Sequence, residues 1–195
     1  MGGSALAQTK IATVDLKKLF DNYYKTKLAQ AAIQERASQL DKDDKSMKDD
    51  LKKGSDDYKK LVQQANDQAL SADERDRRKQ SADDKLKQLQ ASKDAIDQFE
   101  RQAQTTLSEQ RQRMRDNILV EIKAAVATKA KAANDTLVFD TAAETVNGTM
   151  AVIYSTNDND LTDAVLAQLN AGAPIDLTKP DTTTPPSVTN APGSP

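Results

Sequence analysis

The feature that most constrains this chain is a short break between two long, highly charged segments that contain no proline. The break reads Ala69-Leu70-Ser71-Ala72-Asp73-Glu74. Ser71 followed three residues later by Glu74 is a capping box, in which the hydroxyl and the carboxylate each accept from the other residue's amide. We therefore expect one helix to end near Ala69 and another to begin at Ser71. Two long helices joined so closely lie antiparallel, which predicts a helical hairpin over residues 25–133 with its tip near residues 70–71.

Apolar residues follow a heptad repeat along both arms of this hairpin, which is typical of a coiled-coil seam. The stripe on the first arm consists of Ile33, Ala37, Leu40, Asp44, Met47, Leu51, Gly54, Tyr58, Leu61 and Ala65. The return arm continues with Ala82, Leu86, Leu89, Lys93, Ile96, Phe99 or Ala103, Leu107, Met114 and Ile118. The repeat slips near Phe99, which predicts a local change in winding. At about 1.5 Å per residue the first arm would be about 65 Å long, so the hairpin must project from the rest of the chain.

Gly54 interrupts the first arm, and three interpretations are open. A glycine inside a helix costs about 1 kcal/mol, so the position can be a tolerated weak point. It can also be a flex point that lets the arm bend outward. In a third interpretation the hairpin tip lies here, although the two arms would then be very unequal in length.

Short strand and helix patterns flank the hairpin. Residues 10–15 alternate between apolar and small or polar side chains, which predicts a strand, and Asp15 can cap a helix over residues 16–24. Residues 118–133 are the most apolar part of the return arm, so we expect them to dock onto a compact body.

Two more strands and a last helix are predicted after the hairpin. The strands are residues 137–140 and 149–154, separated by a turn at Asn147-Gly148. Asp160 can cap the helix, whose apolar side carries Leu161, Val165, Leu166 and Leu169.

The predicted fold is α+β and mostly α, with the hairpin of residues 25–133 projecting from a small β-rich body of residues 10–24 and 134–172. Residues 1–9, which include Ala5-Leu6-Ala7, are interpreted as a leader or signal-peptide remnant, and the Pro- and Thr-rich residues 173–195 as a disordered tail. Three short strands are marginal alone and leave unpaired edges, so we expect the body to associate with other copies. The expected contact residues are Ile11, Val14, Leu137, Phe139, Val152 and Tyr154.

Composition narrows the functional classes. Among 195 residues there is no cysteine and no histidine, the formal net charge is −2, and only 4% of residues are aromatic. The usual general acid–base residue and metal ligand is therefore missing, and no phosphate-binding glycine loop is present, so we expect neither an enzyme nor a cofactor or metal site. The charge balance gives no support for nucleic-acid binding. No apolar run approaches the length of a membrane span.

The order and spacing of these elements resemble the OmpH/Skp family of periplasmic chaperones. The residues that carry the resemblance are Lys10-Ile11-Ala12-Thr13-Val14-Asp15, Leu19-Phe20, Leu70-Ser71 with Glu74, Leu137-Val138-Phe139-Asp140, Val152-Ile153-Tyr154, Asp160-Leu161-Thr162, Val165-Leu166 and Leu169-Asn170. The resemblance covers about residues 10–170. It implies a homotrimer in which a β-barrel body joins the subunits and helical tentacles enclose unfolded outer-membrane proteins without ATP.

Two features depart from that family. Its best-known members have strongly basic arms, whereas the arms here are balanced in sign, so charge gives no support for contact with an acidic membrane. The basic residues at the tip, Arg75, Arg77, Arg78 and Lys79, are offset by Asp73, Glu74 and Asp76. Residues 141–148 resemble an insertion between the last two strands, and the Pro- and Thr-rich tail is additional.

Two functions are consistent with the sequence. The first is an ATP-independent holdase that contacts unfolded clients weakly, with Val62, Leu70 and Phe99 as candidate client-facing residues, although each of these can instead pack against its own partner helix. The second is a structural coiled-coil or tethering protein of the cell envelope without client-holding activity. The predicted strands lie on both sides of the hairpin and bring the chain back to one place, which a plain spacer does not need and which favours the holdase.

Overall fold

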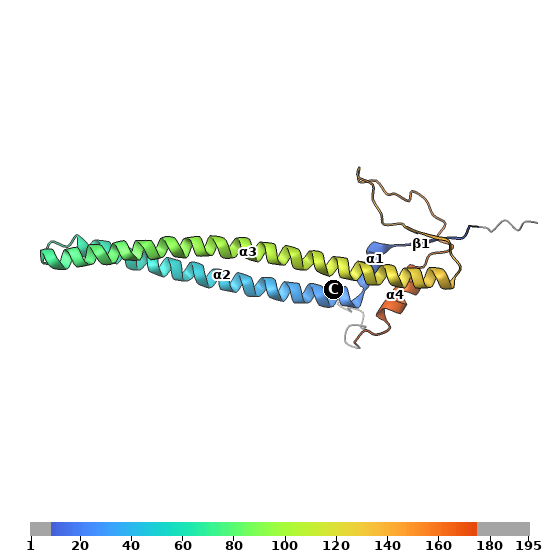
Figure 1. The fold of residues 1–195 in the computed structure, drawn as a ribbon, viewed down its shortest axis with the longest axis horizontal. Helices are drawn as coiled ribbons and strands as arrows, with labels where there is room; N and C mark the ends of the chain where they lie inside the picture. The colour runs from blue at the N-terminus through green and yellow to red at the C-terminus, as the bar shows by residue number, and fades with distance from the viewer. Residues whose placement is uncertain (1–8, 175–195) are drawn as a thin grey trace, which may run out of the picture.

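The structure, a computed structural model, describes residues 9–174, so residues 1–8 of the expected leader and residues 175–195 of the expected tail lie outside the described residues. The elements in order are β1 (Ile11–Val14), α1 (Leu16–Asn22), α2 (Tyr24–Ala65), α3 (Ala72–Ala132), β2 (Leu137–Asp140) and α4 (Thr162–Asn170). Figure 1 shows α2 and α3 side by side as a long hairpin, with the small elements gathered at its base. The predicted α+β, mostly helical fold with a long antiparallel hairpin is confirmed.

The first arm ends earlier than predicted. Helix α2 stops at Ala65 rather than near Ala69. The carboxylate of Asp67 accepts from the amide of Ala69 at 2.9 Å. This local turn competes with the helical bonds of the same residues, so the chain leaves the helix before the tip.

The predicted cap at the start of the second arm forms only in part. Ser71 Oγ accepts from the amide of Glu74 at 3.3 Å and caps α3, as predicted. The carboxylate of Glu74 accepts from Arg78 at 3.1 Å instead of turning back to the serine amide. Arg78 also donates to Gln64 of α2, which ties the two arms together at the tip.

The seam is buried along the first arm, where every predicted stripe position of α2 is buried or half-buried. On α3, Ala82, Ile96 and Ile118 are buried, but Leu86 and Lys93 are exposed. The prediction of those two seam positions was wrong. Lys85, one residue before Leu86, is half-buried, and its stem lies beside Gly54 of α2. The seam therefore passes through position 85 rather than 86, while Ala82, Leu89 and Ile96 keep the seven-residue spacing.

Gly54 lies within the continuous helix α2 and is buried. A Cβ placed there would come within 2.9 Å of Leu89 Cδ2 on α3. The missing side chain therefore allows the two helices to approach closely at this point. The interpretation that the hairpin tip lies at Gly54 was wrong, because α2 continues to Ala65.

The body is built around the C-terminal part of α3, as predicted for residues 118–133. Its core combines residues of α3, β1, α1, the α1–α2 junction and the start of α4. These residues are Ile118, Ile122, Ala125, Val126, Ala130, Ala12, Val14, Leu19, Tyr23, Leu161 and Val165. The C-terminal part of α3 thus belongs to the body while the rest of the same helix forms the arm.

Strands β1 and β2 form a parallel two-stranded sheet in which Ile11 lies opposite Leu137. A parallel pair needs a long connection between its strands, and here the whole hairpin provides it. Side chains alternate between the two faces, so Ala12 and Val14 enter the core. On the opposite face Ile11, Leu137 and Phe139 are each nearly half exposed, at 46–48%.

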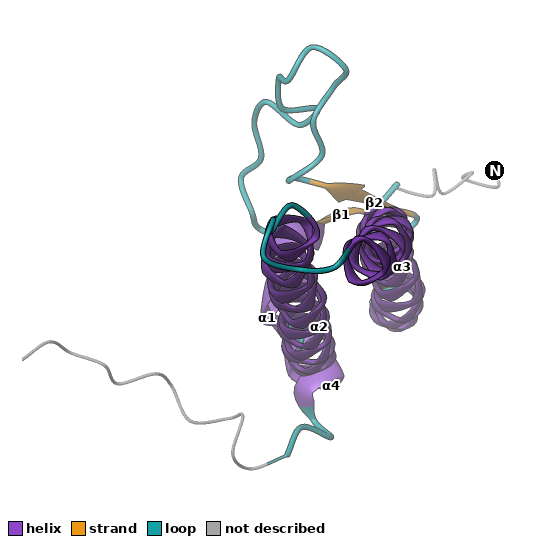
Figure 2. Cartoon of the chain, turned by 90° about the vertical axis from the view of Figure 1, so that its left-hand side faces the viewer, coloured by secondary structure: helices purple, strands orange, loops and turns teal. Residues whose placement is uncertain are grey.

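The predicted third strand over residues 149–154 is wrong. These residues belong to a long excursion, residues 141–159, that projects from the body in Figures 1 and 2. The predicted turn is present, since Gly148 has φ 73° and a single antiparallel bridge joins Glu144 to Met150. Both edges of β1 are occupied, by β2 and by residues 159–161. Within the described part of the chain, residues 152–154 form no backbone hydrogen bonds with a neighbouring strand.

Candidate assembly and client-contact surfaces

An exposed apolar surface lies between the outer face of the sheet and residues 141–159, which we call the projecting segment. It encloses a groove of about 880 Å³. Ile11, Thr13 and Phe139 line the groove from the sheet, and Ile153 and Tyr154 line it from the segment. We call this surface the sheet groove.

The projecting segment carries apolar side chains that its own chain barely covers. Ile153 is 94% exposed and Tyr154 is 83% exposed. Val146, near the tip of the excursion, is fully exposed. Single exposed apolar residues are common, but a continuous apolar surface next to an unpaired extended segment is typical of an interface.

Most of the residues predicted for oligomerisation lie on or beside the sheet groove. Phe139, Val152 and Tyr154 line it together with Ile11, and Leu137 lies beside Ile11 on the same face of the sheet. Val14 does not join them. It is 2% exposed and packs in the chain's own core, because it points to the opposite face of β1.

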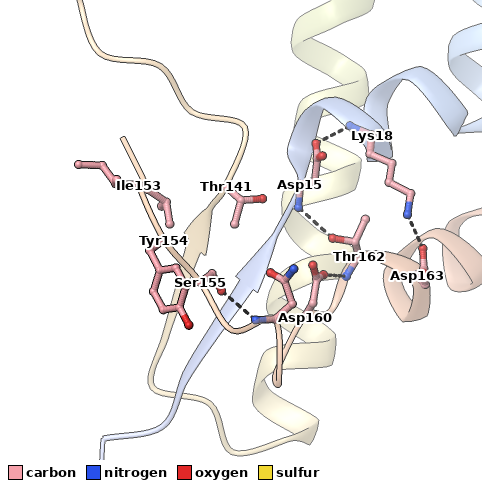
Figure 3. A pocket seen from close by; sticks show the side chains of 11 residues that line it. Asp15, Lys18, Thr141, Ile153, Tyr154, Ser155, Asp160, Thr162 and Asp163 are labelled. Atoms are coloured by element: carbon pink, nitrogen blue, oxygen red, sulfur yellow. Dashed lines mark hydrogen bonds and ion pairs between the residues drawn. The ribbon is translucent and has the colours of Figure 1, made fainter. Parts of the chain in front are cut away.

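A polar hollow of about 470 Å³ lies between the projecting segment and the starts of α1 and α4 (Figure 3). Several of its polar groups form hydrogen bonds at the starts of α1 and α4. Thr162 Oγ1 accepts from the amide of Asp15 at 2.9 Å, and Asp160 Oδ1 accepts from the amide of Thr162 at 2.7 Å. Lys18 donates to Asp163 at 2.8 Å, and this bond raises the pKa of Lys18. These bonds fix the starts of α1 and α4.

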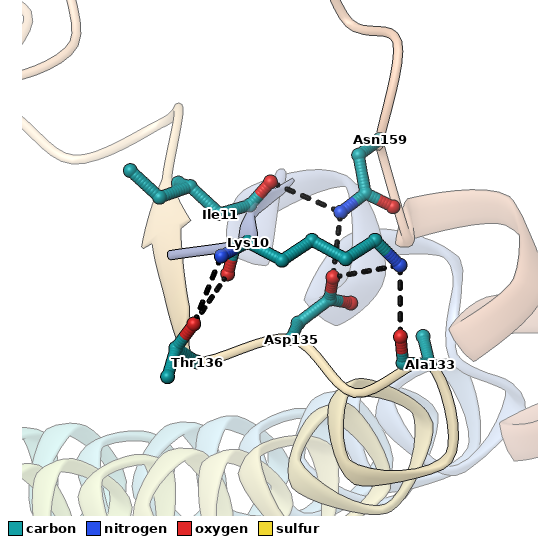
Figure 4. Close-up of polar contacts among 6 residues, drawn as sticks. All are labelled: Lys10, Ile11, Ala133, Asp135, Thr136 and Asn159. Carbon is teal, nitrogen blue, oxygen red and sulfur yellow. Dashed lines mark hydrogen bonds and ion pairs between the residues drawn. The ribbon is translucent and has the colours of Figure 1, made fainter. Parts of the chain in front are cut away.

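A second polar cluster fixes the base of the projecting segment (Figure 4). The side chain of Asp135 is fully buried and pairs with Lys10 Nζ at 3.2 Å. It also accepts from Asn159 Nδ2 at 2.8 Å, and the same Nδ2 donates to the carbonyl of Ile11. Lys10 Nζ donates to the carbonyl of Ala133, just after α3. The cluster thus joins the end of α3, the start of β1 and the end of the excursion.

The candidate client-facing residues are not gathered into one site. Val62 and Leu70 are half-buried close to the tip. Phe99 is half-buried farther down the arm, where it lines a seam hollow of about 340 Å³ together with Leu40 and Leu107. Each of the three side chains is therefore partly covered by its own hairpin.

The sequence did not indicate some residues that the structure shows to be exposed apolar side chains or buried polar contacts. The exposure of Ile153 had a sequence signal, because this residue lies in a predicted strand to which no partner strand was assigned. Asp135 had none, since a buried carboxylate that joins three distant segments looks in sequence like any other aspartate in a turn.

Fold and surface together define a class of protein in which a long antiparallel hairpin projects from a small α+β body. The model of the family described as Outer membrane protein (OmpH-like) matches residues 10–169, and the chain belongs to that family. No curated protein matches the sequence. Among residues 9–174, no helix combines the length and apolarity that crossing a bilayer requires.

A solved structure shares the fold. It is the 2.83 Å crystal structure of a proposed outer membrane chaperone (OmpH-like) from Caulobacter crescentus. The two chains are 15% identical, with a TM-score of 0.67, and the match covers 88% of this chain and 89% of the other. At that identity the likeness concerns the fold.

Proposed function

We propose that this protein is an ATP-independent holdase chaperone of the periplasm, which encloses unfolded outer-membrane or envelope proteins between its helical arms. The observation that carries the proposal is the pairing of a long polar hairpin with a body whose sheet face and projecting segment are uncovered. Membership of the OmpH-like family and the likeness to a protein described as an outer membrane chaperone support a chaperone role in general.

The proposed assembly is a homotrimer joined through the bodies. In this arrangement the projecting segment of one copy covers the sheet groove of the next, so each copy both gives and receives a contact. Such a head-to-tail contact closes into a ring when the rotation between copies fits. Ile153 and Tyr154 would then be buried, and the unpaired backbone of residues 152–154 would gain a partner strand.

The proposed client contact is weak and spread over the inner faces of the arms. The arms carry mixed charges and few exposed apolar side chains, so no single contact is strong, and a client can leave without ATP. In this proposal the chain, which has no histidine or cysteine, binds its client without catalysing a reaction and carries no cofactor.

The test is an aggregation assay. A urea-unfolded outer-membrane β-barrel protein is diluted into buffer with increasing amounts of the full chain and without nucleotide, and turbidity is followed. We expect turbidity to fall to the baseline near one trimer per client. Unchanged turbidity at a several-fold excess of trimer would contradict the holdase function.

One observation favours the second candidate, a structural tether of the cell envelope. The hairpin covers much of its own apolar surface, including Phe99, and so leaves little for a client. In the same assay a tether would leave aggregation unchanged while the protein still assembles.

A further inference from the structure

The arm leaves the body at a break between α1 and α2. Tyr23 alone separates the two helices, and its backbone is extended, with φ −69° and ψ 127°. The Tyr23 side chain is nevertheless buried in the core of the body, and its ring meets that of Tyr24 edge to face at 5.3 Å between centroids. The break is therefore a packed joint and not a loose loop.

Asn170, the last residue of α4, bonds both sides of this break. Its Oδ1 accepts from the amide of Tyr24 at 2.9 Å, and its Nδ2 donates to the carbonyl of Asn22 at 3.1 Å. The first bond satisfies a free N–H at the start of α2, and the second satisfies a free carbonyl at the end of α1. One side chain thus closes the gap between the two helices.

Glu121 of α3 holds the joint from the other side. Its Oε2 accepts from the hydroxyl of Tyr23 at 2.6 Å and from Lys25 Nζ at 2.7 Å. Lys25 Nζ also lies 5.8 Å from the centre of the Tyr23 ring, which is close enough for a cation–π contact. The start of α2 is therefore tied to α3 through Tyr23 and Lys25 together.

The two helices of the arm join the body in different ways. Helix α3 runs unbroken from the tip into the core, whereas α2 is interrupted at its base. For the arm to tilt, α3 must bend and the start of α2 must slide along it. Such sliding breaks the bonds made by Asn170 and Glu121.

We propose that Asn170 and Glu121 are positioning residues that clamp the base of α2 and so set how far the arm opens. The clamp itself is independent of any client, and its consequence for client holding rests on the proposed function. Rigid elements locked by surrounding hydrogen bonds hold a binding geometry more closely than free joints do.

The clamp can be tested in the full chain without a client. Asn170→Leu removes both bonds at similar volume, Asn170→Asp keeps the acceptor for the Tyr24 amide but loses the donor, and Glu121→Gln keeps an acceptor for Tyr23 but loses the charge. Gln168→Leu, an exposed change two residues earlier on α4, is the matched control. Amide exchange of residues 22–28 reports local opening of the joint.

We expect exchange of residues 22–28 to be about tenfold faster in Asn170→Leu than in the wild type, because two hydrogen bonds at the joint are lost. Asn170→Asp and Glu121→Gln should give smaller increases and Gln168→Leu none. Exchange in the middle of α3 should not change, whereas general destabilisation would accelerate it as well.

Arm position provides a second readout. The chain has no cysteine, so spin labels can be attached after Gln34→Cys on α2 and Ala167→Cys on α4, with labelled subunits diluted by unlabelled ones. We expect a broader distance distribution in Asn170→Leu than in Gln168→Leu.

Wild-type exchange and wild-type distances in Asn170→Leu would overturn the clamp. If Asn170→Leu does not fold, unchanged exchange in Asn170→Asp and Glu121→Gln would overturn it equally. A wild-type protein that fails the aggregation assay while its clamp variants still open would refute the proposed function and leave the clamp supported.

Discussion

The arm and the body of this protein differ in how far their apolar side chains are covered. On the arm, a narrow apolar seam is covered by the partner helix, and the outer faces carry local ion pairs such as Lys53 with Asp50 and Lys59 with Asp56. In the body, Ile153 and Tyr154 of the projecting segment are almost fully exposed, and Phe139 of β2 is nearly half exposed. The arm is complete within one chain, whereas the body leaves apolar surface that the proposed contact with other copies would cover.

The difference follows from the physics of the two elements. Helices satisfy their backbone hydrogen bonds internally, so an antiparallel pair needs only a thin apolar contact. Strands satisfy theirs through neighbours, and a two-stranded sheet is marginal without further cover.

Charging the projecting segment should break the assembly. In the double variant Ile153→Asp/Tyr154→Asp, two side chains that each gain about 1.5–3 kcal/mol on burial can no longer be buried at a subunit contact. We expect association to weaken at least about a hundredfold, measured by sedimentation velocity over a range of concentrations. Val146→Asp, equally exposed but outside the sheet groove, is the control and should assemble normally. A double variant that stays assembled at wild-type concentrations would refute the proposed contact.

Removing the buried carboxylate of Asp135 should destabilise the body. Asp135→Ala leaves Asn159 and the half-exposed Lys10 without their shared partner, and leaving a part-buried hydrogen-bond donor unpaired costs about 1–3 kcal/mol. Urea unfolding followed by circular dichroism measures the loss. Asp158→Ala, at an exposed position, is the control. A change below 0.5 kcal/mol, on the order of an ordinary surface substitution, would show that the cluster does not stabilise the body.

Substitutions at Gly54 should separate packing from flexibility in the arm. Gly54→Ala gains up to about 1 kcal/mol of helix propensity, and its methyl group displaces only the flexible end of Leu89, so we expect unchanged or slightly higher thermal stability. Gly54→Leu should lose about 1–3 kcal/mol through overpacking. If Gly54→Ala also lowers client capacity in the aggregation assay, the arm bends at this position. Equal stability of the two variants would contradict the close approach of the helices.

The ion pair at the base of the arm should give the smallest effect. The bond from Lys25 lowers the pKa of Glu121, so its stabilisation is present above the ordinary glutamate pKa and is lost as the pH falls below it. Because the Glu121 side chain is 43% exposed, solvent screening limits the contribution to below about 1 kcal/mol. Unfolding free energies of the wild type and Glu121→Gln should converge between about pH 5 and pH 3. A constant difference across that range would exclude the ion pair as the cause.

The arm could be predicted from sequence because its determinants are local. Heptad spacing placed the seam, and Ser71 placed the start of α3. The errors in the arm have local causes as well, since the turn at Asp67 shortened α2 and the stem of Lys85 occupies the seam position that was assigned to Leu86.

The body could be predicted only in part because its determinants are distant in sequence. Residues 149–154 have the pattern of a strand, yet pattern alone does not supply the neighbouring strand that pairing requires. The roles of Asp135 and Asn170 depend on contacts between segments far apart in the chain. Asp135 has no sequence signal, and the family resemblance that includes Asn170 does not indicate what its side chain bonds.

The most direct test of this account is the mass of the wild-type chain in solution at micromolar concentration, measured by light scattering after size exclusion. The proposed homotrimer should give a single species of three times the 21.3 kDa of one chain. A stable monomer would contradict it, because the sheet groove and the projecting segment would then stay uncovered in the folded protein.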